Sequence, residues 1–579
     1  MNTELLPNHH SGKINRLLWI LAAGIFALNA LQAWLTPLID DEAYYWVWSQ
    51  KPDWGYFDHP PMVAWWIKPG FLLLQNELGV RLITAAAAAL GFWILGNFLR
   101  LKSRAELVLY TALYMSFVMF QIFSFITTPD APLLFFSIVY VVVWRRFLQN
   151  ASWLNSALLG VCMALLMYSK YHAALLILFS ILPVFWQLRR NVQLYSAVLL
   201  GVVLYLPHLW WQWQHDFVSI EFHLVRRSVH DHFKFNFITD YLLAIVYTGS
   251  PLVFYWVVKR LLKPRWSSSF EKSMYWTVLV TLIFLLLMTF KTYVQAQWIL
   301  VALVPMFYLL FQFLRNKPQW VATTQKLAIV GAGLLLLARI YMAIPSPPVK
   351  IQYHGYKEFM QQAGQHTDKW AAFERYQSTS LFNFYNYPHK QAANIVTIEN
   401  RKSQYDIWQS EEMLQGNDFT YFSQFIQSQD SLMLHSARTE SYKYRKIEDF
   451  QTLYLIAMQV LEAESTADSI FLTINLENHH QRAVSYTPEG TMKLYANFTP
   501  EMYALESYCM EEVQIPAFQL EPGQSVQLRA KLPRCALQDG KHFIYLGFAQ
   551  EGIPMKIQSN HLQIYYPHSP QTGKSSQTN

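Results

Sequence analysis

The chain has 579 residues, of which 53% are apolar, 16% aromatic and only 14% charged. An ordinary soluble domain is roughly 25% charged, so this composition excludes a purely soluble protein. With 21 glycines and 26 prolines and no dominant repeat, collagen-like and disordered chains are excluded as well. Residues 1–344 carry 26 Lys and Arg against 14 Asp and Glu, whereas residues 345–579 carry 19 against 24. This change of sign predicts two parts that face different solvents.

The first part contains eleven apolar runs, each close to the roughly 20 residues that cross a membrane as a helix. They lie at residues 17–35, 80–99, 105–122, 131–148, 153–169, 171–188, 194–211, 239–261, 273–290, 296–314 and 326–344. The first run follows Lys13 and Arg16 as a secretory signal would, but it is long and no clear small-residue cleavage site follows it. We therefore expect a cytoplasmic N-terminus at 1–16 and a membrane domain of about eleven helices at 17–344.

The connections between these runs alternate in charge. One set is basic and contains Lys13, Arg16, Arg100, Lys102, Arg104, Arg145, Arg146, Arg189, Arg190, Lys259, Arg260, Lys263, Arg265, Arg315 and Lys317. The other set is acidic and contains Asp40, Asp41, Glu42, Asp58, Asp130, Asp216 and Glu221. Because basic connections stay in the cytoplasm, eleven crossings place residues 345–579 outside. We expect an integral protein of a plasma membrane such as the bacterial inner membrane.

The second part is predicted to form two extracytoplasmic domains. Residues 345–467 mix short helical and strand-like runs and indicate an α/β domain. From 468 to 567, polar and apolar residues alternate in several short segments, which predicts a small antiparallel β-sandwich. The tail at 568–579 is rich in Ser, Gln, Thr and Lys and is predicted to be disordered. This half contains no catalytic constellation, which favours a binding or positioning role.

Two of the three cysteines, Cys509 and Cys535, fall in the predicted extracytoplasmic part. Oxidation is permitted there, so a disulfide between them is one interpretation, although spacing alone does not prove pairing. Cys162 lies inside an apolar run and is interpreted as a small packing residue.

Three adjacent carboxylates, Asp40, Asp41 and Glu42, follow the first apolar run. They repel one another beside low-dielectric lipid, a setting that raises carboxylate pKa values toward those of a general base. All three are therefore candidate site residues. The alternative is a solvated loop whose acidic residues begin the next helix. The polar stretch that follows adds Tyr56, Asp58 and His59 as further candidates.

Charged residues elsewhere on the predicted outer side extend this set. Asp130 begins the fourth run, either as a second acid of the site or as a helix-start residue stabilised by the positive helix end. Lys170 and Lys291 lie on the sparsely basic side, where they either snorkel to the interface or hold an anionic headgroup. We favour the second interpretation. Arg226 and Arg227, in the loop before the eighth run, join this set or contact lipid phosphates.

Together these residues resemble a family of membrane enzymes. Asp41-Glu42, the stretch Tyr56-Phe57-Asp58-His59-Pro60-Pro61, Asp130, Lys170 and Lys291 occur in an order similar to that of the protein O-mannosyltransferase and aminoarabinose lipid A transferase superfamily, which has the GT-C fold. The likeness covers residues 15–345. It extends loosely into Glu374-Arg375-Tyr376-Gln377 and Ser403-Gln404-Tyr405-Asp406-Ile407-Trp408. It implies a polytopic α-helical, GT-C-like membrane protein.

The resemblance implies an inverting glycosyltransferase that moves a sugar from a polyprenyl-phosphate carrier, such as undecaprenyl phosphate, to lipid A, a glycan or a protein outside the membrane. Asp41 matches the catalytic base, with Glu42 beside it, and Asp130 matches a second acid near the acceptor. Lys170 and Lys291 match cations that hold the carrier phosphate. At the position where the aminoarabinose transferases have a lysine, this chain has His59, which can still donate a hydrogen bond to phosphate.

We expect no metal requirement, because no tight ligand spacing occurs. Asp41, Asp130 and His59 nevertheless offer oxygen and nitrogen ligands for a divalent ion. No nucleic-acid partner is indicated. Two other functions stay open. A transporter or flippase of lipid-linked sugars would favour ionisable residues within spans and internal repeats. A membrane-anchored envelope assembly factor would account for residues 468–566 but not for eleven spans.

Overall fold

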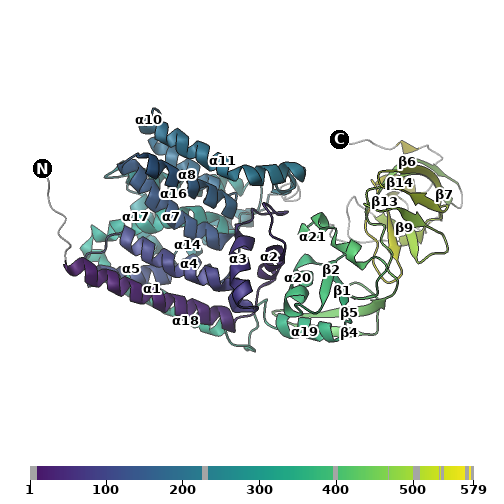
Figure 1. The fold of residues 1–579 in the computed structure, drawn as a ribbon, viewed down its shortest axis with the longest axis horizontal. Coiled ribbons are helices and arrows are strands. Elements are labelled where there is room, and N and C mark those ends of the chain that lie inside the picture. Colours follow the sequence, from purple (N-terminus) through teal and green to yellow (C-terminus); the bar gives the residue numbers. More distant parts are fainter. Residues whose placement is uncertain are drawn as a thin grey trace. The chain divides into compact units, whose positions relative to one another are not determined.

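The computed structural model describes residues 9–223, 233–395, 402–466, 469–499, 509–533, 535, 540–566 and 573–574. The chain forms two compact units, Met1–His354 and Gly355–Asn579 (Figure 1). The first unit is helical. Its elements are α1 (His9–Leu35), α2 (Asp40–Gln50), α3 (Met62–Leu73), α4 (Glu77–Phe98), α5 (Arg104–Ser116), α6 (Val118–Ile122), α7 (Asp130–Gln149), α8 (Trp153–Ser169), α9 (Ala173–Ile181), η1 (Leu182–Val184), α10 (Phe185–Leu188), α11 (Val192–Gln214), α12 (Val218–Glu221), α14 (Phe235–Thr248), η3 (Pro251–Val253), α15 (Phe254–Leu261), α16 (Ser269–Met288), η4 (Ala296–Ile299), α17 (Leu300–Arg315) and α18 (Pro318–Met342).

All eleven predicted apolar runs are helical, but the structure does not confirm eleven crossings. Seven helices are long and apolar enough to cross a membrane, and the pair α14 and α15, bent by 89°, makes up to eight among the described residues. The runs predicted at 105–122, 153–169 and 171–188 form shorter or interrupted helices. The apolar composition of these runs correctly predicted helices. It did not determine where each helix is interrupted or how long it is.

Helix α17 forms the centre of the membrane unit and is buried over nearly its whole length. Helices α1 and α18 lie along one side of the unit, and α10 and α11 lie along the other (Figure 1). Helices α8 and α11 approach closely because Gly160 faces the backbone of Ala197: a Cβ at Gly160 would lie 2.6 Å from that carbonyl oxygen. Small residues at such contacts are typical of helix packing in membranes.

Two interrupted helices satisfy each other's backbone inside this unit. The break at Phe117 separates α5 from α6, and the break at Gly249 separates α14 from η3. The N–H of Val118 donates to the carbonyl of Gly249 at 2.8 Å. The side chain of Gln121 donates to the carbonyl of Tyr114 at 3.2 Å, which satisfies a group freed by the first break. Non-helical backbone is tolerated in a membrane unit only where protein satisfies it in this way.

The second unit begins with an α/β domain. Its elements are α19 (Tyr356–Gln365), β1 (Trp370–Phe373), α20 (Tyr376–Tyr385), β2 (Gln391–Asn394), α21 (Gln404–Ile407), η5 (Ser410–Leu414), β3 (Phe419–Ser423), β4 (Ser431–His435) and β5 (Thr439–Ile447). The sheet has the order β2-β1-β3-β5-β4. Strands β2, β1 and β3 are parallel, whereas β5 pairs antiparallel with β3 and β4.

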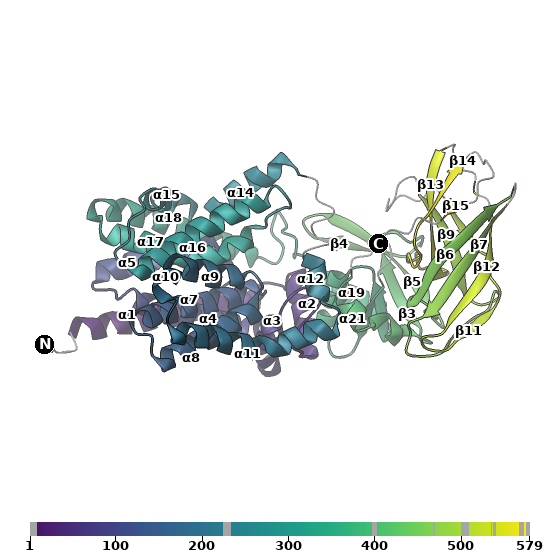
Figure 2. The ribbon, with the colours of Figure 1, turned by 90° about the horizontal axis from the view of Figure 1, so that it is seen from above.

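A sandwich of antiparallel sheets follows. Its strands are β6 (Ile456–Ser465), β7 (Ser469–Asn478), β8 (Val484–Tyr486), β9 (Met492–Thr499), β10 (Cys509–Glu512), β11 (Phe518–Leu520), β12 (Ser525–Pro533), β13 (Gly540–Gln550), β14 (Leu562–Tyr566) and β15 (Gly573–Lys574). Figure 2 shows β6, β7 and β12 side by side in one sheet. The boundary predicted at 467 lies too late, because β6 pairs along its length with β7. Of the predicted disordered tail, Gly573 and Lys574 pair with β6, and the other residues lie outside the described ones.

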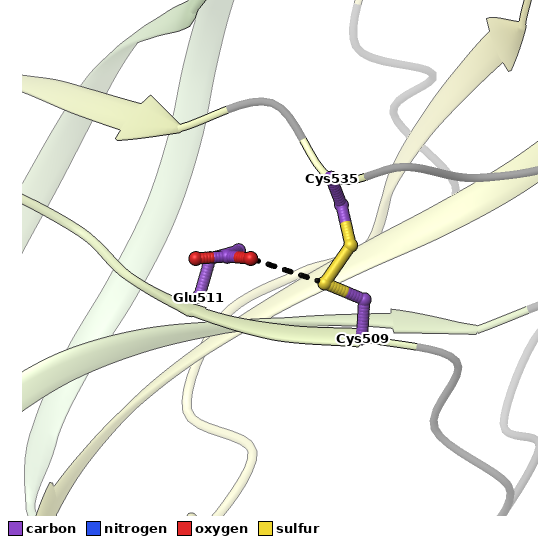
Figure 3. The surroundings of a disulfide bond; sticks show 3 residues. All are labelled: Cys509, Glu511 and Cys535. Carbon is purple, nitrogen blue, oxygen red and sulfur yellow. Dashed lines mark hydrogen bonds between the residues drawn. A yellow bond between two sulfur atoms is a disulfide. The ribbon is translucent and has the colours of Figure 1, made fainter.

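Cys509 and Cys535 form a disulfide, beside which the carboxylate of Glu511 lies (Figure 3). These three residues are also the only group of three or more His, Cys, Asp and Glu among the described residues whose ligand atoms lie within 4.8 Å of one another. With both sulfurs in the disulfide, the cluster is a cross-link within the sandwich and not a metal centre. Cys162 is a buried free thiol in α8, as its predicted packing role requires.

One carboxylate joins the α/β domain to the sandwich. Glu412 in η5 accepts hydrogen bonds from Nδ1 of His480 at 2.6 Å and from Nε of Arg482 at 3.0 Å. Nε2 of His480 accepts from the N–H of Leu455, so Nδ1 carries the ring proton. Burial would raise the pKa of Glu412, but the hydrogen bonds from His480 and Arg482 outweigh it and lower the pKa below its ordinary value.

Glu412→Gln should destabilise the second unit by about 1–3 kcal/mol at pH 7, because buried donors lose an ionised acceptor. The lowered pKa means that the stabilisation is present above the ordinary value of 4.5 and is lost as pH falls through the folded-state pKa. Thermal unfolding of the full chain at pH 7 and pH 4 measures both effects. The variant should lose less stability in acid than the wild type, and an equal loss would contradict this assignment. Glu477→Gln, at an exposed pair with His479, is the matched control.

Candidate active site

A buried ion pair anchors the start of α2. Glu42 and Arg81 are both fully buried, and the carboxylate accepts from Nε of Arg81 at 2.7 Å and also from its Nη2. The same carboxylate accepts from the backbone N–H of Thr127 at 2.7 Å. Because α7 begins three residues after Thr127, Glu42 brings the starts of α2 and α7 together. This geometry favours an anchoring role for Glu42 over the predicted catalytic one.

Arg81 was not among the predicted site residues. Its guanidinium also donates to the carbonyls of Ala33, Thr36 and Pro37, at 3.1, 2.6 and 2.9 Å. It therefore fixes the end of α1 and the turn that leads into α2. The signal in the sequence was a single arginine inside the apolar run at 80–99, since a charge in such a run is rarely without a partner.

Asp40 and Asp41 occupy the first turn of α2 and are half-buried. Asp40 accepts from the N–H of Asp41 at 3.0 Å and from the side chain of Gln352 at 3.3 Å. Burial raises the pKa of Asp40, with a smaller contribution from the charge of Glu42, while backbone hydrogen bonds oppose the shift. Asp40 and Asp41 therefore begin a helix, as the alternative interpretation of this cluster states. This position is compatible with a role in the predicted site as well.

Asp130 and Lys170, predicted to have separate roles, form a salt bridge. Asp130 is the first residue of α7 and Lys170 directly follows α8. The ammonium group donates to both carboxylate oxygens, at 2.7 and 2.9 Å, and both side chains are buried. An ammonium group has three N–H donors, so one donor of Lys170 is not used by this pair.

A hydrogen-bond network leads from Tyr171, the residue after Lys170, to the backbone of Trp54 and Tyr56. His208 donates from Nδ1 to the carbonyl of Trp54 at 2.8 Å, so its Nε2 accepts from the hydroxyl of Tyr171 at 3.0 Å. Gln212 donates to the same hydroxyl and to Ser219, which in turn donates to the carbonyl of Tyr56. The network holds the turn after α2 against α11.

The turn packs tightly at Gly55, where a Cβ would lie 2.4 Å from the ring of Trp211. Asp58 is buried and its carbonyl accepts from Nε2 of His223 at 2.7 Å. The rings of His59 and His223 lie 5.9 Å apart. His59 therefore sits beside a second histidine that sequence reasoning did not single out.

The remaining predicted residues are less closely connected. Lys291 is exposed, three residues after the end of α16. Arg226 and Arg227 lie outside the described residues. The structure thus connects Asp41, Glu42, Asp130 and Lys170 through adjacent elements, whereas among the described residues no side-chain hydrogen bond or ion pair joins Lys291 to them.

Comparisons with known proteins show what this chain is similar to. Residues 58–211 match the family described as dolichyl-phosphate-mannose-protein mannosyltransferase. ArnT from Cupriavidus metallidurans superposes with a TM-score of 0.55 at 11% identity, over 74% of this chain and 97% of ArnT. The chain has the GT-C fold. The fold that the sequence resemblance implied is thereby confirmed, and the seven long apolar helices among the described residues make this chain an integral membrane protein.

Two further similarities concern relatives of this GT-C chain. ArnT bound to undecaprenyl phosphate superposes with a TM-score of 0.53 at 12% identity, over 73% of this chain and 97% of ArnT. The lipid A galacturonosyltransferase RgtD from Rhizobium johnstonii is 25% identical over 301 residues. That match covers 50% of this chain, which spans 63% of the length of RgtD.

Arg81→Met should destabilise the protein by about 3–5 kcal/mol, because it leaves the carboxylate of Glu42 buried without its cation. The double variant Arg81→Met with Glu42→Met should recover much of this loss, since no buried charge remains. Thermal unfolding of the purified full chain measures both. A double variant as unstable as the sum of the two single variants would contradict the pairing. Arg315→Met, at a more exposed pair with Glu106, should cost less.

Proposed function

We propose that this protein is an inverting glycosyltransferase that moves a sugar from a polyprenyl-phosphate carrier to a lipid, glycan or protein acceptor on the extracytoplasmic side of the membrane. One observation carries the proposal. Glu42, next to Asp41, accepts a hydrogen bond from the N–H of Thr127 just before α7, and Asp130 at the start of α7 forms the salt bridge with Lys170. The fold shared with ArnT and the identity to RgtD support it.

The proposed reaction assigns Asp41 the role of general base. Its carboxylate takes the proton of the acceptor hydroxyl while the hydroxyl oxygen attacks the anomeric carbon. The bond from that carbon to the carrier phosphate breaks, and its electron pair leaves with the phosphate oxygen, which inverts the anomeric centre. A positioned carboxylate of this kind contributes roughly 10²- to 10⁴-fold to the rate.

Cations near the leaving phosphate provide the second contribution. Negative charge grows on the phosphate oxygens as the bond breaks, so fixed cations stabilise the transition state more than the ground state. In this proposal Lys170 keeps its two bonds to Asp130 and offers its third donor to a phosphate oxygen. Lys291, being exposed, and His59 complete the phosphate contacts. The Asp130 carboxylate thereby aims Lys170 as well as facing the acceptor.

None of these steps requires a metal ion, and metal independence stays a prediction of the proposal. The proposed orientation rests on the alternating charge of the connections, which keeps the basic ones, such as that of Arg145 and Arg146, in the cytoplasm. That orientation places the start of α2 at the extracytoplasmic face of a plasma membrane such as the bacterial inner membrane.

Asp41→Asn should lower transfer by about 10²-fold or more while leaving the affinity for undecaprenyl phosphate unchanged, because only proton removal is lost. Transfer is measured by mass spectrometry of envelope lipids and glycans from cells that lack the native copy and produce the variant. Affinity is titrated with undecaprenyl phosphate on the purified full chain in nanodiscs. Asp216→Asn, an exposed aspartate after α11, is the matched control. Wild-type transfer by Asp41→Asn would refute the assignment of the base.

Lys291→Met should weaken binding of undecaprenyl phosphate about tenfold, because the leaving phosphate loses a cation at an accessible position. Its exposure makes a folding defect unexpected. Lys263→Met, an exposed lysine in the connection between α15 and α16, is the control and should bind as the wild type does. Unchanged affinity in Lys291→Met would remove Lys291 from the proposed phosphate site.

A further inference from the structure

Besides Arg81 and Arg260, a third arginine is buried in the described part of the membrane unit, in the last turn of α18. Arg339 is 4% exposed. Its guanidinium donates from Nη2 to the side-chain oxygen of Asn29 at 2.8 Å and from Nη1 to that of Gln121 at 3.2 Å. It also lies 4.8 Å from the ring centre of Phe125. One guanidinium therefore contacts α1, α6 and the segment that leads to α7.

Arg339 differs from the other buried arginines in having only neutral acceptors. Arg81 and Arg260 each form an ion pair with a glutamate, whereas Arg339 forms none among the described residues. A buried cation without a counter-charge is costly, and an ionisable residue inside a membrane unit is by default a candidate for function. An apolar side chain would fill this place at lower cost, so packing alone does not account for an arginine.

The network is also poorly optimised for stability. Nε of Arg339 and Nδ2 of Asn29 have no hydrogen-bond partner in the described part of the chain. A buried donor without a partner lowers the stability of the folded state. This cluster leaves two donors unsatisfied, yet it bridges three segments. We therefore attribute it to the relative placement of those segments and not to a gain in stability.

A chain of hydrogen bonds leads from Arg339 to the start of α2. Gln32 donates to the carbonyl of Arg339 at 3.1 Å and to the hydroxyl of Thr36 at 2.7 Å. The carbonyl of Thr36 accepts from Arg81, whose guanidinium holds Glu42. Thr36, four residues before Asp40, is therefore bonded to Arg81 directly and to the backbone of Arg339 through Gln32.

A parallel chain leads from Arg339 toward Asp130. Gln121 accepts from Arg339 and donates to the carbonyl of Tyr114 at the break between α5 and α6. The hydroxyl of Ser124 donates to Asn29 at 3.0 Å, and so ties the segment before Thr127 to the same cluster. Helices α1 and α6, which precede the elements that carry the two proposed catalytic acids, thus meet at one guanidinium.

We propose that Arg339 is a positioning residue, which sets Asp41 and Asp130 relative to each other by bridging Asn29 on α1 and Gln121 on α6. The inference rests on the proposed function, because its readout is transfer. It requires the planar fork of arginine, whose two Nη groups reach acceptors on different helices. Lysine keeps the charge but not the fork, so Lys should not replace Arg at this position.

The test compares Arg339→Gln, Arg339→Lys and Gln32→Met with Arg315→Gln as the matched control at a pair with Glu106. Transfer in cells is normalised to the amount of folded protein, and affinity is titrated with undecaprenyl phosphate on the full chain in nanodiscs. Arg339→Gln and Arg339→Lys should lower transfer about tenfold or more with affinity within about threefold of the wild type. Gln32→Met should also lower transfer. The double variant with Arg339→Gln should transfer little less than Arg339→Gln alone.

Three results would overturn the inference. Unchanged transfer per folded protein in Arg339→Gln, with only a lower melting temperature, would make the residue structural. A loss of undecaprenyl phosphate affinity with unchanged transfer at saturation would make it a phosphate contact. Full rescue by Arg339→Lys would make its charge, not its geometry, decisive. Asp41→Asn is measured alongside these variants. Wild-type transfer by Asp41→Asn would overturn the proposed function and this inference together. Loss of transfer in Asp41→Asn with full transfer in Arg339→Gln would overturn this inference alone.

Discussion

The ion pair of Glu42 and Arg81 is the interaction on which the site depends. Both side chains are removed from solvent, so neither charge is tolerable without the other, and the pair is forced to form wherever the two helices can bring it together. In forming, it joins the end of α1, the start of α2 and the segment before α7. The acidic residues that flank these points are carried into one neighbourhood as a consequence.

Several buried or half-buried charges near the helix ends of the membrane unit form ion pairs. Asp130 neutralises Lys170, Glu106 neutralises Arg315 and Glu271 neutralises Arg260. This arrangement follows from the cost of an isolated charge in a low-dielectric interior. Two places outside these ion pairs carry the functional argument: the half-buried start of α2, where Asp41 follows a carboxylate with a raised pKa, and Arg339, which bridges neutral amides.

Different interactions hold the second unit together. Its sheets are completed by backbone pairing and by strands with one buried face, and its cross-links are the disulfide of Cys509 and Cys535 and the bonds of Glu412. Sequence reasoning identified the sandwich strands because alternation of polar and apolar residues has a period of two. It placed the boundary after β6 because residues 345–467 were assigned to the α/β domain, whereas β6 pairs with β7 of the sandwich.

The sequence by itself determined that the chain spans a membrane, where its apolar helices lie and which acids and lysines gather near their ends, because hydropathy and charge act locally and need no partner to be recognised. It also contained the residues that resemble GT-C enzymes. Only the tertiary structure decided the pairing: that Lys170 meets Asp130, that Glu42 is held by Arg81, and that Arg339 reaches α1 and α6. These contacts join residues far apart in the chain, and no local pattern states which of several buried charges will find which partner.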